Sequence, residues 1–198
     1  MSAIPKTLLT PEQYLAQERR AEFKSEYYRG EVFAMAGASF EHTVIKDNLA
    51  RKAGNQLEGG SCRVLTSDIR IKVPATGLYT YPDVVVICDE PQFEDPHFDT
   101  LLNPRIIIEV LSDSTEKYDR GDKFRQFRDI PSLREYVLVA QNVALIERYV
   151  RQPNDDWLLT TFDKPSGTFE FVSVPVRIAL SELYRGVNFP EKGESRVP

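Results

Sequence analysis

Two acidic residues stand in apolar stretches of the sequence, where an ionised side chain is costly to bury. Asp83 follows Pro82 at the start of the run YPDVVVIC, and Glu109 lies inside the run RIIIEVL. Both runs are apolar on both sides of the predicted strand, which is typical of central strands. A buried carboxylate without a partner is strongly destabilising. Each of these acids therefore needs a partner.

A divalent cation between Asp83 and Glu109 would satisfy both carboxylates. Side by side without a cation, they would repel and raise each other's pKa. Mg²⁺ binds a few carboxylates while keeping several waters, so it is the natural candidate. For each acid alone a structural role is also open: Asp83 could cap a turn after Pro82, and Glu109 could pair with a buried arginine.

A divalent cation held by carboxylates can assist the hydrolysis of a phosphodiester. This reaction usually also needs a cationic group that orients the attacking water and stabilises developing charge. The residue two positions beyond Glu109, on the same face of the strand, is Leu111 rather than lysine. The cation must therefore come from elsewhere, and the densely charged stretch YDRGDKF follows closely.

A helix is expected in this stretch, capped by Asp113 or by Asp119 and ending at about residue 128 or 130. It places Lys123 at the margin of its buried face, from which the ammonium could reach back toward the strand. The alternative is a surface ion pair between Lys123 and Asp119, which are i, i+4 neighbours.

The remaining pattern predicts one α/β domain over residues 1–198, with a mixed sheet and a polar tail at about 190–198. Helices are expected over about 10–20 and from Ser39, where apolar residues recur at helical spacing: Ile45, Leu49, Ala53 and Leu57. Strands are expected in CRVLTSDIRIKV, YPDVVVIC and RIIIEVL. Further strand pairs are expected around Arg29-Gly30, around Gln141-Asn142, and between WLLTTF and TFEFVSV.

Composition narrows the functional classes. The chain has 198 residues, of which 41% are hydrophobic and 28% charged, as in ordinary globular proteins. No apolar run approaches the ~20 residues of a membrane helix, and the first residues do not resemble a signal peptide. We therefore expect a cytoplasmic protein that does not enter membranes.

Cys62 and Cys88 are expected to be small buried thiols, and no histidine lies at zinc-ligand spacing. The net charge of −5 argues against coating nucleic acid by bulk electrostatics.

These residues resemble a known family. Pro82-Asp83, followed by Glu109 in EVL, resembles the Asp…Glu-x-Lys signature of the PD-(D/E)XK nuclease superfamily. The longer run from PRIIIEVLSDSTEKYDRGDKF to LREYVLV closely resembles the Uma-type family of predicted endonucleases within it, as do SEYYRGEVFAMAG, EHTVI and SDIRIKV. The resemblance extends from about residue 7 to residue 180.

The resemblance implies a restriction-endonuclease-like α/β fold, with a mixed central sheet flanked by helices and extra β-hairpins. It also implies a site for Mg²⁺ or Mn²⁺ in which Asp83, Glu109 and the backbone carbonyl of Val110 are the ligands. Leu111 departs from the superfamily, where lysine is usual. Lys123 fits the place of a lysine that has moved to the following helix.

Other positions matching the family are open to two interpretations. His42 could touch the site or only cap and pack the long helix. Asp68 could be an outer acid of the site or a structural partner of Arg70. Arg120, together with Arg125 or Arg128, could contact DNA phosphates, although such residues more often form a solvated helix face.

The sequence therefore predicts a metal-dependent endonuclease that hydrolyses DNA phosphodiester bonds, with Asp83 and Glu109 holding the metal and Lys123 orienting the attacking water. A homodimer would supply two sites for double-strand cleavage, although no pattern specifies an interface. The alternative is a catalytically inactive module of the same fold that binds nucleic acid or a protein. A hydrolase of a phosphorylated small molecule is a weaker third interpretation, because no Gly-rich phosphate loop is present.

Overall fold

The computed structural model describes residues 8–189 and is built around a six-stranded mixed sheet. Its strand order is β11-β10-β9-β8-β6-β3. Only β8 and β9 are parallel, and the other neighbours run antiparallel. The strands are β3 (Cys62–Thr66), β6 (Val84–Cys88), β8 (Ile106–Leu111), β9 (Glu135–Ala140), β10 (Ile146–Arg151) and β11 (Trp157–Phe162). The expected mixed α/β architecture is confirmed.

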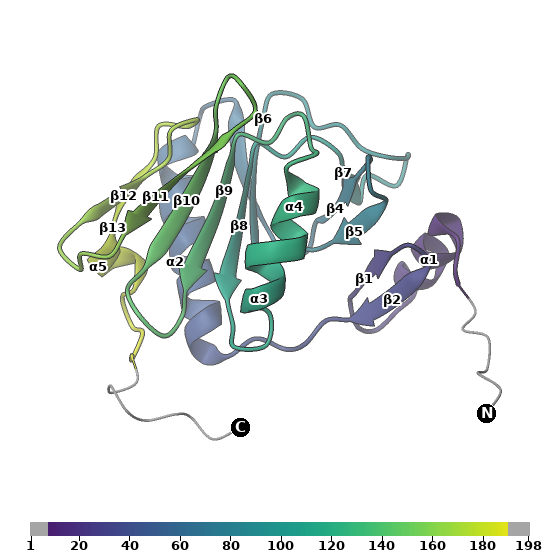
Figure 1. Cartoon of the computed structure of the whole chain (residues 1–198), viewed down its shortest axis with the longest axis horizontal. Coiled ribbons are helices and arrows are strands. Elements are labelled where there is room, and N and C mark those ends of the chain that lie inside the picture. Colours follow the sequence, from purple (N-terminus) through teal and green to yellow (C-terminus); the bar gives the residue numbers. More distant parts are fainter. Residues whose placement is uncertain (1–7, 190–198) are drawn as a thin grey trace.

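The two faces of this sheet are covered by different helices (Figure 1). The long helix α2 (Phe40–Leu57), capped by Ser39 as expected, packs on one face. The other face carries a helix made of α3 (Glu116–Tyr118), the π-helical turn η1 (Asp119–Lys123) and α4 (Phe124–Phe127). Side chains alternate along β8 accordingly. Ile106, Ile108 and Val110 face α2, and Ile107 and Leu111 face the second helix.

A second sheet of five strands lies beside the first, with the order β2-β1-β5-β4-β7. Its strands are β1 (Ser25–Tyr28), β2 (Glu31–Ala34), β4 (Arg70–Val73), β5 (Leu78–Thr80) and β7 (Thr100–Leu101). The expected hairpin around Arg29-Gly30 is β1–β2. Helix α1 (Pro11–Glu18) begins with the expected capping box of Thr10 and Gln13. The run CRVLTSDIRIKV is not one strand, because it is divided between β3 in the large sheet and β4 in the second.

The C-terminal elements differ from the expectation. WLLTTF forms β11, which pairs with β10 rather than with TFEFVSV. The later segment forms β12 (Thr168–Glu170), which pairs with β13 (Arg177–Ala179) before helix α5 (Leu180–Leu183). The fully buried carboxylate of Glu135 explains part of this arrangement. It accepts hydrogen bonds from the backbone amides of Val172 and Ser173 and so fixes the end of β12 to β9.

The expectation of two free thiols is wrong. Cys62 and Cys88 are directly opposite each other on β3 and β6 and form a disulfide. The sequence could not show this pairing, because it depends on the register of the two strands. The polar tail predicted at about 190–198 lies outside the described residues. Within residues 8–189, no helix is both long enough and apolar enough to cross a membrane.

A buried arginine network joins α1 to the second sheet. Arg70 is buried and donates to the hydroxyls of Tyr81 and Thr100, at 2.7 and 3.0 Å. Asp99 contacts this guanidinium at 3.0 Å and accepts from Arg19 Nε at 2.7 Å. The hydrogen bond from Arg19, aided by the charge of Arg70, holds the pKa of Asp99 well below its usual range.

We expect Asp99→Asn to lower the free energy of unfolding at pH 7 by about 1–3 kcal/mol, because Arg19 and Arg70 lose a shared anion. The carboxylate's contribution is fully present above the unfolded-state pKa of about 3.9. It is lost as the pH falls from there through the lower folded-state pKa. Urea unfolding of both proteins between pH 3 and pH 7 measures the difference.

Asp122→Asn is the control, because Asp122 pairs with Arg125 at 3.0 Å on the exposed side of the second helix. Its effect should stay within about 0.5 kcal/mol. Equal losses in the two variants, or a difference that persists unchanged to pH 3, would contradict the role assigned to Asp99.

Candidate active site

Asp83 and Glu109 meet at the carboxyl end of β8. Val84 pairs with Ile108 in the antiparallel ladder, so the next pair along it is Asp83 and Glu109. The backbone amide of Asp83 donates to Glu109 Oε2 at 3.3 Å. The amide of Val110 donates to Asp83 Oδ2 at 2.8 Å. The structure thus brings together the two acids that the sequence singled out.

The hydrogen bond from the Val110 amide to Asp83 also bears on the predicted role of the Val110 carbonyl as a metal ligand. In a strand, the N–H and C=O of one residue leave the backbone on the same side. Because the Val110 amide points at Asp83, its carbonyl also lies on the Asp83 side of β8. This position is compatible with a third oxygen ligand.

Lys123 reaches back to the strand. Its Nζ lies 2.9 Å from Glu109 Oε1, and the side chains of Lys123 and Glu109 are almost completely buried, at 6% and 5% exposed. The alternative in which Glu109 pairs with a buried arginine is therefore wrong. The i, i+4 contact of Lys123 with Asp119 is also present, at 3.4 Å, but it is buried rather than on the surface.

A π-helical turn positions this lysine. The helix does not begin at a cap on Asp113 or Asp119 as expected. It begins after Thr115, and Asp113 instead accepts a hydrogen bond from Asn142. Asp119 opens the π-turn and Lys123 closes it. Single π-helical turns are rare in proteins, and those that occur often lie at functional sites.

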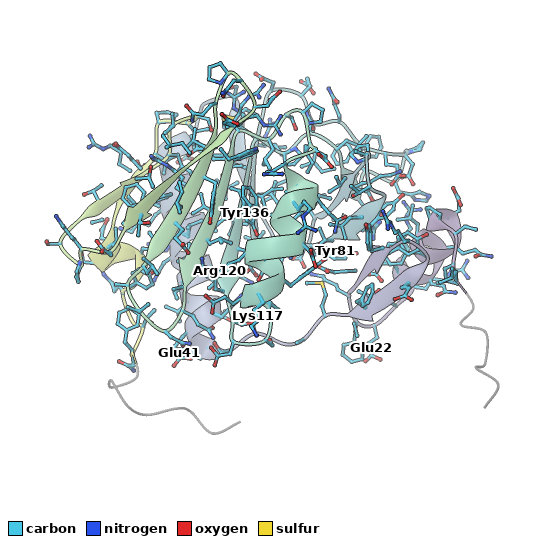
Figure 2. All side chains as sticks on the ribbon, viewed as in Figure 1. Glu22, Glu41, Tyr81, Lys117, Arg120 and Tyr136 are labelled. Atoms are coloured by element: carbon cyan, nitrogen blue, oxygen red, sulfur yellow. A yellow bond between two sulfur atoms is a disulfide. The ribbon has the colours of Figure 1, made fainter. Side chains whose placement is uncertain are left out.

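Two contacts hold the π-turn against the sheet. Tyr136 of β9, labelled in Figure 2, donates its hydroxyl to the backbone carbonyl of Asp119 at 2.9 Å. Phe124, directly after the turn, stacks on the same tyrosine ring at 4.9 Å. The helix is thereby fixed at the level of β8 at which Lys123 meets Glu109.

Sequence reasoning missed Glu26. This carboxylate, from β1 in the second sheet, lies 3.3 Å from Lys123 Nζ and accepts a hydrogen bond from Thr80 Oγ1. Burial, together with the nearby charge of Glu26, raises the pKa of Tyr118. The only sequence signal was the polar residue in the short strand SEYY, and nothing local connected it to a lysine far along the chain.

The structure places the three other candidate site residues, His42, Asp68 and Arg120, in different surroundings. His42 both packs at the start of α2 and touches the site, because its Nε2 lies 3.1 Å from Asp83 Oδ2. Asp68 lies in an exposed turn rather than a strand and pairs with Lys24. Of its two interpretations, a structural partner of Arg70 is wrong, because Arg70 pairs with Asp99, and an outer acid of the site stays a prediction. Arg120 forms ion pairs with Glu116 and Glu147 on the flank of the helix.

The electrostatics of the cluster are dominated by burial. Burial raises the pKa of Glu109 well above its usual value, and the neighbouring carboxylates of Asp119 and Asp83 raise it further, against the opposing effect of Lys123. The pKa of Asp119 is raised mainly by burial as well. Burial alone would lower the pKa of Lys123. The carboxylates of Glu109, Glu26 and Asp119 outweigh it and raise that pKa well above its usual value.

The donor set fits a hard divalent cation. Three carboxylates, those of Glu26, Glu109 and Asp119, lie within 3.4 Å of the Lys123 ammonium, and Asp83 adjoins Glu109. Acidic groups therefore outnumber the ammonium in this largely buried place. Glu109 Oε1 is buried and has no well-directed hydrogen bond. Within residues 8–189, no three acid, histidine or cysteine side chains converge as a ready metal cage. Mg²⁺ commonly uses one or two carboxylates and completes its shell with water and phosphate oxygens.

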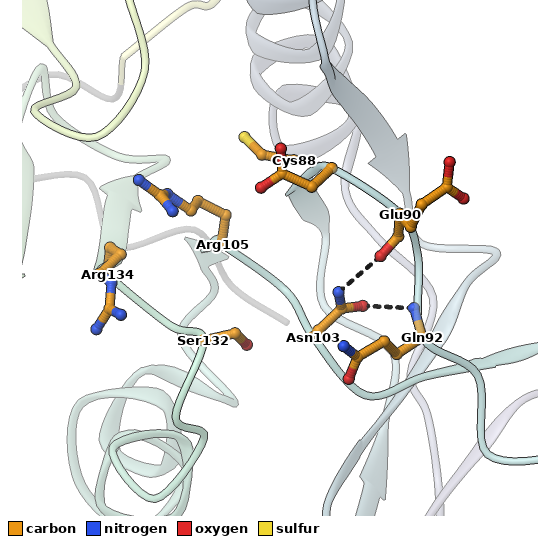
Figure 3. Close-up of a pocket in the computed structure, with 8 residues that line it drawn as sticks. Cys88, Glu90, Gln92, Asn103, Arg105, Ser132 and Arg134 are labelled. Atoms are coloured by element: carbon orange, nitrogen blue, oxygen red, sulfur yellow. Dashed lines mark hydrogen bonds between the residues drawn. The ribbon is translucent and has the colours of Figure 1, made fainter.

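A cavity of about 360 Å³ lies at the other end of β8 (Figure 3). Arg105 and Arg134, which precede β8 and β9, line it together with Asn103 and Ser132. Asn103 there accepts a hydrogen bond from the Gln92 amide at 2.7 Å. This cavity shares no residue with the cluster formed by Glu26, Asp83, Glu109, Asp119 and Lys123, called the acid–lysine cluster below.

The chain is similar to several known proteins. The Uma2 family model, described as "Putative restriction endonuclease", matches residues 11–180. The uncharacterized protein slr1290 of Synechocystis sp. is 39% identical over 181 residues, covering 91% of this chain and 94% of that protein. A second uncharacterized Synechocystis protein, sll1609, is 37% identical over 164 residues, covering 83% and 93%.

The crystal structure of a "putative nuclease belonging to DUF820" from Anabaena variabilis superposes with a TM-score of 0.73 at 16% sequence identity. The match covers 89% of this chain and 97% of that one. With the mixed sheet and its flanking helices, this similarity defines the restriction-endonuclease-like α/β fold. The chain belongs to the Uma2 family of restriction-endonuclease-like proteins. Family membership and fold together support a nuclease function.

Removal of the buried ammonium should destabilise the protein. We expect Lys123→Met to lower the free energy of unfolding by about 3–5 kcal/mol, because Glu109 is left buried without its cation. The loss should be larger at pH 8 than at pH 5. Without the lysine, the folded-state pKa of Glu109 rises further above its unfolded value, and stability is lost as the pH rises through it. Urea unfolding at the two pH values measures both effects.

The exposed residue Lys117 supplies the control for this experiment. Lys117→Met should change stability by no more than about 0.5 kcal/mol. The double variant Lys123→Met/Glu109→Gln should recover part of the loss, because the uncompensated charge is gone. No recovery would mean that packing of the lysine stem, rather than its charge, stabilises the fold.

Proposed function

We propose that the protein is a metal-dependent endonuclease that hydrolyses DNA phosphodiester bonds. The observation that supports this most directly is the buried contact between Lys123 and Glu109 beside Asp83. It brings two hard carboxylate ligands and one fixed ammonium group to the same end of the sheet. Carboxylates that can hold a cation and an ammonium that can stabilise developing negative charge are groups that metal-assisted phosphate hydrolysis can use.

In this proposal Asp83 and Glu109, with the carbonyl of Val110, hold Mg²⁺ or Mn²⁺. When bound, the cation supplies Lewis-acid stabilisation of negative charge on the phosphate. Lys123 donates a hydrogen bond that orients the attacking water. Glu109 holds that ammonium in place, and His42 Nε2 contacts Asp83 Oδ2, the same oxygen that accepts the Val110 amide.

The alternative is an inactive module of the same fold that binds nucleic acid or a protein. It is motivated by Leu111, which is buried where most of the superfamily has lysine. The position of Lys123 favours the active enzyme, because its ammonium meets the strand glutamate from the following helix. Affinity for Mn²⁺ distinguishes the two readings, since the inactive module in its simplest form has none.

We expect plasmid DNA to be cut in Mg²⁺ or Mn²⁺ and left intact in EDTA. Glu109→Gln, Asp83→Asn and Lys123→Ala should each slow cleavage by about 10²-fold or more, because each removes a group that acts on the reacting phosphate or its water. Asp113→Asn, which alters an exposed acid just after β8, should cleave at the wild-type rate.

Metal binding gives a readout that does not depend on cleavage. Mn²⁺ should raise the melting temperature of the wild type and of Asp113→Asn, because a ligand that binds the folded state stabilises it. The melting temperature of Glu109→Gln should not respond. A wild-type protein that neither binds Mn²⁺ nor cuts duplex or single-stranded DNA would rule out the proposed function.

A further inference from the structure

One face of the β1–β2 hairpin is turned toward the acid–lysine cluster. Glu26 points that way, since its carboxylate contacts Lys123. Residues directly opposite each other in an antiparallel pair share a face. The partner of Glu26 in the ladder is Phe33 of β2, so the Phe33 ring emerges on the same side. It therefore lies beside the cluster and not in the tyrosine core on the other face.

The exposure of Phe33 is unexplained by packing. Tyr27, on the opposite face of the same hairpin, is buried in the core with Tyr14 and Tyr79. Phe33 remains 47% exposed, on a strand at the edge of the five-stranded sheet. An aromatic ring is thus exposed on an edge strand, on the same face as Glu26.

Two lysines converge on the rim of the candidate site from separate elements. Lys24, just before β1, donates to the backbone carbonyl of Ser67 at 2.9 Å. Lys46 of α2 lies 3.5 Å from the hydroxyl of the same serine. Ser67 directly follows Thr66, which pairs with Val84 next to Asp83. Lys24 is also paired with Asp68, so the two lysines and this acid together leave one net positive charge at the rim, within a chain whose net charge is −5.

This combination matches one class of ligand. Duplex binding rests mainly on many phosphate contacts, which a protein of net negative charge is poorly equipped to make. Single strands are bound by a few cations together with aromatic rings on which bases stack. We infer that the protein acts on DNA that is unpaired at the cleaved position, with a base stacked on Phe33 and the adjoining phosphate near Lys24 and Lys46. This inference rests on the proposed nuclease function and narrows its substrate.

The test measures, by fluorescence anisotropy, the affinity of the protein for a labelled 20-nucleotide single strand and for the matching duplex. EDTA is present so that no cleavage occurs. The wild type should bind the single strand more tightly than the duplex. Phe33→Ala should weaken single-strand binding about 5- to 100-fold, the range for loss of one base–aromatic stack. Phe33→Trp should retain affinity.

Phe98→Ala is the matched control, because Phe98 is also an exposed phenylalanine but lies on the loop between β6 and β7 against Phe93. It should bind like the wild type. Phe33→Leu keeps an apolar side chain and guards against a folding defect in the alanine variant. It should still lose affinity, because it has no π-face. With a single strand that contains abasic positions, Phe33→Ala and the wild type should bind with equal affinity, because no base is present to stack on the ring.

Equal affinity of the wild type for duplex and single strand overturns the inference, as does a Phe33→Leu variant that binds normally. Cleavage of plasmid and of single-stranded DNA in Mn²⁺ on the same preparations separates this inference from the proposed function. Metal-dependent cutting without single-strand preference rejects the inference alone. Absence of both binding and cutting rejects the two together.

Discussion

The burial of one ammonium group among three carboxylates is the constraint on which much of this structure depends. Lys123 touches Glu109 of the large sheet, Glu26 of the second sheet and Asp119 of its own helix. Each contact compensates a charge that would otherwise be costly to bury. The lysine thereby links the two sheets and the helix between them. Both halves of the fold must be in place before its charge is satisfied.

The helix that carries the lysine is itself fixed from both sides. Tyr136 binds the carbonyl that opens the π-turn, and Phe124 stacks on the ring of that tyrosine. The helix also connects β8 to the parallel strand β9, so its two ends are held by neighbouring strands of one sheet. A site built on such an element is more rigid than one built on a free loop.

The sequence predicted local features well because their signals are local. The capping box at Thr10, the apolar stripe of α2 and the alternation along β8 each occupy a few neighbouring residues. Asp83 and Glu109 were recognised because an acid in an apolar strand is costly wherever the strand lies. Their direct juxtaposition depends on the pairing of β6 with β8, and the resemblance to the nuclease superfamily implied it.

Features that depend on register or on distant contacts were not predictable. The division of CRVLTSDIRIKV between two sheets, the partner of β11 and the Cys62–Cys88 disulfide are all decided by which strands pair. Glu26 was missed for the same reason, since its partner lies far along the chain. The helix start was misplaced because the π-turn, with Gly121 inside it, departs from the regular helical spacing on which caps are predicted.

The arrangement of the site also affects the order in which a newly made chain can become active. Glu26, His42, Asp83, Glu109 and Lys123 come from separate segments, and Lys123 is synthesised last of the five. Synthesis adds about 5–20 residues per second, and domains generally fold as units. An incomplete chain on the ribosome therefore holds the acids without the ammonium that compensates them. The cluster is therefore complete only after Lys123 has been added and its helix has packed against both sheets.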